Sequence, residues 1–256
     1  MSDLEVQPTA EPVPAGSGLS QWQRVVNAFA APSKTFEDIK RGNRSWWLPF
    51  LIMILFSYVL FAGITMKVGW QQVAQNNIGM NPKQAARIDQ LNADQKASAI
   101  RVAGTITEII MAASPVVILI VASIVSLLLW GTINFGFGGK TSFGQIFAVN
   151  MYATLPNIFP AILGTIALYA GLAPESFKIN NVAGTNVAYY LSFQDTNKAL
   201  YAFASQIDII SIWVAILLSI GIAKLAGKNK SAGYITVFGW WAVWTVLRVI
   251  GGLVAG

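Results

Sequence analysis

The sequence contains no cysteine and no histidine among its 256 residues, and only 11% of its residues are charged. Without cysteine there is no thiol nucleophile, disulfide or Cys/His zinc site. Without histidine there is no histidine general base and no serine–histidine–aspartate triad. We therefore expect no enzymatic activity, no catalytic or metal-binding residues and no cofactor. Because a soluble domain carries roughly 25% charged residues, the composition also argues against a soluble fold.

Hydrophobic residues make up 55% of the chain and gather in long blocks. The first block, residues 46–66, has 21 residues without a charge. At about 1.5 Å per residue it reaches about 31 Å, the thickness of the hydrocarbon core of a bilayer. The sequence predicts an all-α integral membrane protein, with a bundle of five transmembrane helices in residues 46–256. The predicted spans are residues 46–66, 109–133, 143–170, 207–226 and 234–255.

The residues ahead of the first span divide into two parts. Residues 1–20 contain many Pro, Gly and acidic residues and few bulky apolar groups, which predicts a disordered tail. Residues 21–45 carry apolar residues at helical spacing, interrupted by Pro32, which predicts two short amphipathic helices in the headgroup layer. Thr35 and Asp38 have the spacing of a capping box. Packing of the two helices on the bundle itself is the alternative.

Aromatic residues around these helices are the predicted interfacial anchors. Trp46 and Trp47 stand where an aromatic belt meets the bilayer, at the start of the first span. The full predicted set of anchors is Trp22, Phe29, Phe36, Trp46 and Trp47.

Two long connecting segments lie outside the predicted spans. Residues 67–108 are mostly polar, and helix starts are expected at Asn81, which precedes Pro82, and at Asn92, which has Gln95 three residues later. Residues 172–206 lack helical periodicity before Asn197. We expect this second segment to be a loop that folds over the mouth of the bundle.

The distribution of Lys and Arg predicts the orientation. With the N-terminus inside, nine basic residues lie in short cytoplasmic segments, and seven are spread over two longer external loops. The higher density favours a cytoplasmic N-terminus, and five crossings then place the C-terminus outside. Because the basic residues are dispersed, we expect the lipid bilayer and not nucleic acid as the partner.

The third span contains two prolines four residues apart, Pro156 and Pro160. Each removes a backbone donor and favours a break in the helix. Transporters place binding sites at such breaks, so Asn150, Pro156, Asn157 and Pro160 form a candidate broken-helix site. The alternative is a kinked packing helix whose amides bond to neighbouring helices.

Three ionisable residues fall at or within the spans and form a candidate intramembrane polar cluster. Glu108 precedes the second span, Asp208 begins the fourth, and Arg248 lies in the fifth. Because a charge in the bilayer needs a partner, we hypothesise that Asp208 and Arg248 form an ion pair, with Glu108 nearby. The alternative is that the two carboxylates are interfacial helix-start residues and that Arg248 snorkels outward.

Several short motifs resemble the Yip family, named for interaction with Ypt/Rab GTPases, and in particular its bacterial branch. The motifs cover roughly residues 22–251. They comprise Phe29, Pro32, Phe36 and Ile39; Trp46, Trp47 and Pro49; Gly138, Gly139 and Phe143; Pro156; and Ile207, Asp208, Trp213 and Gly221. The resemblance implies a five-helix membrane domain with a cytoplasmic N-terminus, in a bacterial inner (plasma) membrane. Eukaryotic relatives act as trafficking adaptors, but the short N-terminal tail here argues against GTPase binding.

These observations leave two functions open. A non-enzymatic membrane scaffold or adaptor agrees with the amphipathic N-terminal segment, the missing catalytic chemistry and the resemblance, and its partner would be another membrane protein or a second copy of the chain. A small transporter or channel with a site near the broken third span is the alternative. An intramembrane two-aspartate protease is unsupported, because Asp208 is the single aspartate in the spans.

Overall fold

The computed structural model describes residues 18–227 and 230–255, which are mostly helical and contain no β-strand. Five helical segments have the length and apolar composition of membrane spans, as predicted. They are α3 (Trp47–Lys67), α7 (Ser114–Gly131) with its π-helical extension (Thr132–Gly136), the pair α8 (Phe143–Ala153) and α9 (Ile158–Tyr169), α11 (Ile209–Ala226) and α12 (Lys230–Ala255). The predicted disordered tail lies outside the described residues except for residues 18–20.

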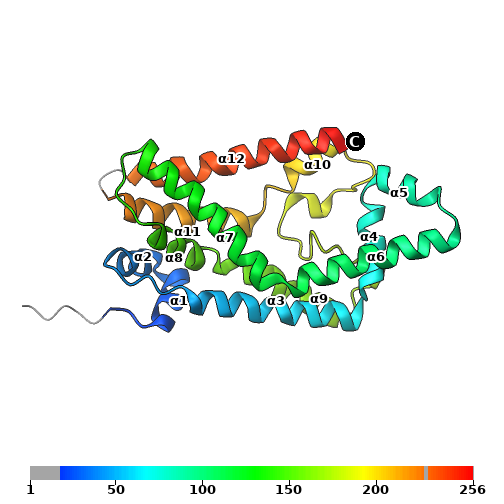
Figure 1. Cartoon of the computed structure of the whole chain (residues 1–256), viewed down its shortest axis with the longest axis horizontal. Coiled ribbons are helices and arrows are strands. Elements are labelled where there is room, and N and C mark those ends of the chain that lie inside the picture. Colours follow the sequence, from blue (N-terminus) through cyan, green and yellow to red (C-terminus); the bar gives the residue numbers. More distant parts are fainter. Residues whose placement is uncertain (1–17, 228–229, 256) are drawn as a thin grey trace, which may run out of the picture.

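The remaining helices gather at the two ends of the bundle (Figure 1). At one end lie α1 (Gln21–Ala30) and α2 (Pro32–Lys40). At the opposite end lie α4 (Trp70–Gly79), α5 (Pro82–Asp89), α10 (Lys198–Ala204) and the start of α6 (Ala93–Ala112). The C-terminal end of α12 lies at this second end as well.

The second span begins five residues later than predicted. Helix α6 continues to Ala112, and Pro115 stands in the first turn of α7 after a break at Ala113. A proline disfavours helical geometry in the residue before it and cannot donate a backbone hydrogen bond. Apolar residues before the proline therefore belong to α6, a helix that the hydropathy pattern merges with the span.

Polar side chains cap several helices where the sequence predicts. Asn81 accepts a hydrogen bond from the backbone of Gln84, and Asn92 forms a reciprocal capping box with Gln95. Asn197 caps α10. The predicted Thr35–Asp38 capping box is wrong, because α2 begins three residues earlier at Pro32 and both side chains turn inward.

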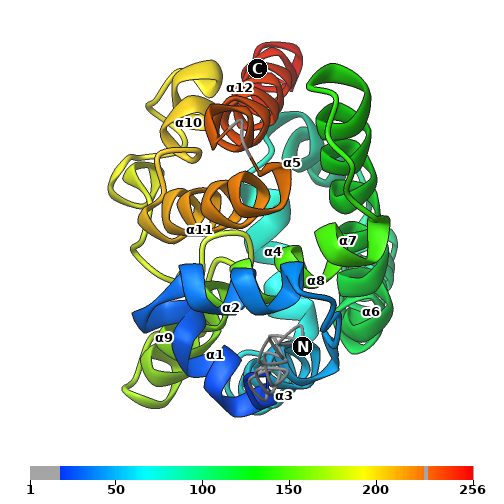
Figure 2. The same cartoon turned by 90° about the vertical axis from the view of Figure 1, so that its left-hand side faces the viewer.

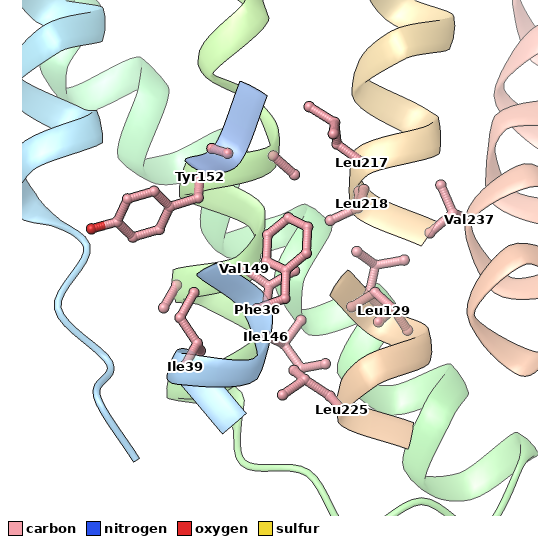
Figure 3. Close-up of a cluster of buried hydrophobic side chains, with 14 of the residues drawn as sticks. Phe36, Ile39, Leu129, Ile146, Val149, Tyr152, Leu217, Leu218, Leu225 and Val237 are labelled. Carbon is pink, nitrogen blue, oxygen red and sulfur yellow. The ribbon is translucent and has the colours of Figure 1, made fainter. Parts of the chain in front are cut away.

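The main core lies at the α1–α2 end of the bundle, where α2, α8 and α11 meet (Figure 3). Phe36 and Ile39 of α2 are fully buried there among apolar residues of α8 and α11. A Cβ atom on Gly221 would lie 2.3 Å from Val149 Cγ1 and 3.3 Å from the Phe36 ring. A side chain at position 221 would therefore separate the three helices.

Burial is uneven among the spans. About half of the third and fourth spans is buried, against 17% for the second and 11% for the fifth. Viewed along the long axis, α8 and α11 lie near the centre, and α7 and α12 lie at the outside (Figure 2). The apolar outer faces of α7 and α12 are therefore available to lipid.

Candidate functional site

The third span is interrupted at its prolines. Helix α8 ends at Ala153, a 3-10 turn covers Leu155–Asn157, and α9 begins at Ile158. Pro156 has no N–H with which to continue the ladder of α8. The backbone N–H and the hydroxyl of Thr154 both donate to the carbonyl of Asn150, at 3.0 and 2.8 Å, and close the last turn of α8.

A cavity of about 500 Å³ adjoins this break, between α3, α7, the third span and α11. We call it the midspan cavity. Its polar lining residues are Ser57, Asn150, Thr154 and Asn157. The other lining residues are apolar, and none of the lining residues in the described chain is charged. The walls therefore suit an apolar occupant better than an ion or a strongly polar solute.

Asn150 faces two neighbours and has little access to solvent. Its side chain amide donates to the Ala122 carbonyl and to Ser126 Oγ, each at 3.1 Å, and the residue is 2% exposed. Both donors of the amide are thus used to join α8 to α7. This geometry matches the packing alternative for Asn150. Pro156 and Asn157 lie in the 3-10 turn between α8 and α9, and Pro160 lies in the first turn of α9.

The two N-terminal helices are joined by a buried ion pair. Arg24 of α1 is completely buried, and its Nε lies 2.7 Å from Asp38 Oδ2 of α2. The Thr35 hydroxyl donates to the Arg24 carbonyl at 2.9 Å. The backbone N–H of Leu19 donates to Asp38 Oδ1 at 3.2 Å. We call residues 18–46 the elbow.

The elbow is attached to the bundle by aromatic contacts. Phe29 lies edge-on to Phe159 and Trp213, with ring centroids 6.0 and 5.8 Å away. Tyr152 of α8 donates its hydroxyl hydrogen bond to Gln21 Oε1 at 2.8 Å. The elbow therefore packs on the bundle. This arrangement is the alternative that the sequence left open beside two helices in the headgroup layer.

The five predicted interfacial anchors differ in exposure: two are exposed, Phe29 and Trp46 are half-buried, and one is buried. Trp22 and Trp47 are 64% and 51% exposed, which leaves them free to contact headgroups. Phe36 was predicted as an anchor, and this is wrong, because it is fully buried in the core. Its helix turns the apolar stripe toward α8 and α11, where burial against protein is more complete than at a membrane surface. Trp46 is half-buried against Phe147 of α8.

Asp208 is the N-cap residue of α11. Its carboxylate accepts hydrogen bonds from the Ser211 backbone N–H at 2.7 Å and from the Thr185 hydroxyl at 2.6 Å. An isolated antiparallel bridge pairs Asn186 with Asp208. Asp208 therefore caps the fourth span and fastens the 172–206 segment to it.

The hypothesised ion pair between Asp208 and Arg248 does not form among the described residues. The Arg248 guanidinium lies over the Trp244 ring, 5.7 Å from its centroid. Glu108 is half-buried on α6, ahead of the break at Ala113. Asp208 forms no ion pair with Arg248 because Thr185 and the first turn of α11 already supply the hydrogen bonds that its carboxylate needs.

Sequence reasoning missed the Arg24–Asp38 pair. Arg24 is one of the nine basic residues on which the predicted orientation rests. A usable signal was present: Arg24 is four residues before Ala28 and Asp38 is three after Thr35, so each charge shares a helical face with small or apolar residues. Opposite charges on two facing apolar stripes indicate a buried pair.

Comparison with known proteins gives one match. The model of the Yip1 domain family matches residues 26–251. No curated protein and no solved structure matches the chain. The matched region begins in α1, includes the first four spans and ends at residue 251 within the fifth, so the chain is a multi-pass membrane protein that belongs to the Yip1 domain family.

Proposed function

We propose that this protein is a non-enzymatic membrane scaffold that presents the elbow to a partner at one face of the bilayer. The partner would be another membrane protein or a second copy of the chain. We place the protein in a bacterial inner membrane with the elbow in the cytoplasm and the C-terminus outside, because the short segments at the elbow end have the higher density of Lys and Arg.

The observation that carries this proposal is the buried Arg24–Asp38 pair. An ion pair sealed inside the protein, together with Phe36 in the core, holds α1 and α2 in one arrangement relative to the spans. A rigid element loses little conformational entropy on binding, which favours recognition by a partner. Trp22 and Val26, one turn apart on α1, are 64% and 61% exposed and form an apolar pair on the outer face of the elbow.

The lining of the midspan cavity also supports the scaffold, because it is unsuited to a conduit for ions or polar solutes. A conduit for ions or polar solutes needs charged or unpaired polar groups along its path. The Asn150 donors are used between helices, and the remaining walls are largely apolar.

A transporter is the second candidate, favoured by the position of the midspan cavity at the broken third span. Discontinuous helices form binding sites in many transporters. Because the walls of the midspan cavity are largely apolar, the transported solute would be apolar as well.

Photo-crosslinking in native membranes tests the scaffold. Benzoylphenylalanine replaces Val26 on the elbow, and in a matched control it replaces Val243, which is exposed on the outer face of α12. We expect a protein adduct of fixed mass from position 26 and only lipid adducts from position 243. Lipid adducts alone from both positions would contradict a partner-binding elbow.

A further inference from the structure

A second cavity, of about 740 Å³, lies at the end of the bundle opposite the elbow. Its walls come from α4, the start of α5, the segment 180–186, α10 and the last part of α12. In Figure 1, α5, α10 and the end of α12 lie at this end of the molecule. We call it the α10–α12 cavity.

The lining of this cavity is basic and rich in amides. Lys198 and Arg248 are its charged residues, and no carboxylate is present among the described lining residues. Six amide side chains complete the polar wall: Asn77, Asn81, Gln84, Asn180, Asn181 and Asn186. The amides of Asn181 and Asn186 donate to each other. Two cations without an acidic partner among the described lining residues match a ligand that is anionic and has several oxygen acceptors.

Arg248 has donors to spare. Within the described chain its guanidinium makes no hydrogen bond or ion pair. It makes a cation–π contact with the face of the Trp244 ring. Arg248 stands six residues before the end of the fifth span, Ser231–Val254, which corresponds to about 9 Å of helix. At that depth a long basic side chain reaches the headgroup layer.

Lys198 is brought to the same cavity by a close helix contact. A Cβ atom on Gly252 would lie 2.7 Å from the Lys198 carbonyl oxygen, so the backbones of α10 and α12 touch one turn beyond Arg248. The ammonium of Lys198 donates to the Phe193 carbonyl and lies 3.9 Å above the Phe193 ring. One of its three donors is used there, and the side chain is held in place.

The surroundings of Arg248 favour a lipid over a soluble anion. Trp244 and Leu247 line the cavity and are 55% and 56% exposed on α12. They offer apolar surface to acyl chains directly beside the cation. We propose that the α10–α12 cavity binds the phosphate of an anionic phospholipid headgroup between Lys198 and Arg248. The scaffold function neither requires nor excludes this site.

Lipid titration of the full chain tests the proposal. The purified protein in non-denaturing detergent is titrated with phosphatidylglycerol, and separately with phosphatidylcholine, and bound lipid is counted by native mass spectrometry. We expect saturable phosphatidylglycerol binding. Loss of one charge-assisted contact in Arg248→Gln or Lys198→Gln should weaken it about tenfold, and Arg248→Lys should retain most of it.

Two controls make the result decisive. Arg101→Gln removes the same charge from an exposed position on α6 outside the cavity and should leave binding unchanged. Equal effects of Arg101→Gln and Arg248→Gln would overturn the site, as would equal binding of both lipids. Millimolar inorganic phosphate distinguishes the sources: displacement of the lipid by phosphate would overturn the lipid assignment in favour of a soluble phosphate. If Arg248→Gln does not fold, Lys198→Gln with its rescue by Lys198→Arg decides the question.

Discussion

Asp38 Oδ2 lies 2.7 Å from Arg24 Nε, and the Arg24 side chain is completely removed from solvent. The pair joins two helices that precede the first span, in a region where membrane proteins often carry separate soluble or interfacial segments. Two charges so placed stabilise one arrangement of α1 and α2, because each would be uncompensated in any other.

Removing one member of this pair should destabilise the protein strongly. Arg24→Ala or Asp38→Ala leaves a buried charge without a partner and should lower the free energy of unfolding by roughly 3–5 kcal/mol. Unfolding in detergent, followed by circular dichroism, measures the loss. The double variant Arg24→Met with Asp38→Leu should recover much of it. Arg41→Ala, which breaks the exposed pair with Glu37, is the control and should cost about 0–1 kcal/mol.

Asn150 should contribute through helix packing. Asn150→Ala removes the hydrogen bonds to Ala122 and Ser126 and should cost about 0.6–1.7 kcal/mol. Because Ser126→Ala removes one of the same bonds, the two changes together should cost less than their sum. Asn157→Ala, at an exposed position of the cavity, should have little effect. Additive losses at positions 150 and 126 would contradict this contact.

Gly221 should tolerate no side chain. In Gly221→Ala the new Cβ would meet Val149 Cγ1 at 2.3 Å, and the overpacking should cost about 1–3 kcal/mol. Val149→Ala removes the obstructing methyl group and should restore part of the stability. Gly239→Ala on α12 has no atom within 4 Å of the new Cβ and is the matched control.

Asp208 and Arg248 should behave as independent residues. Asp208→Ala removes the cap of α11 and the bond to Thr185 and should cost about 0.5–2 kcal/mol. In a double-mutant cycle with Arg248→Ala the interaction energy should stay within about 0.5 kcal/mol of zero. A larger coupling would restore the ion-pair hypothesis.

The spans were predictable because each depends on a local property of the sequence. An uncharged run long enough to cross a bilayer, such as residues 46–66, forms a helix whatever its neighbours are. The break in the third span follows from Pro156, and the caps at Asn81 and Asn92 follow from side chains that bond within three residues.

The candidate sites depended on long-range contacts and were harder to predict. The partner of Arg24 is 14 residues away, and the position of Phe36 is decided by Val149 and Gly221, more than a hundred residues later. Asp208 accepts a hydrogen bond from Thr185, which lies in a loop without helical periodicity. Hydropathy specifies that a charge needs a partner but not which partner it takes.

The proposed scaffold requires the bundle to be a packed anchor and not a path for polar solutes. Because the chain has no cysteine, single cysteines can be introduced at Ser57 and Thr154, which line the midspan cavity, and at Gln23 on the exposed face of the elbow. Each variant is treated in native membranes with a membrane-impermeant maleimide from each side, and full labelling after denaturation confirms the thiol.

We expect rapid labelling of Gln23→Cys from the cytoplasmic side and no labelling of Ser57→Cys or Thr154→Cys from either side. Labelling of both cavity positions would show that water enters the bundle and would contradict the scaffold in favour of a transporter.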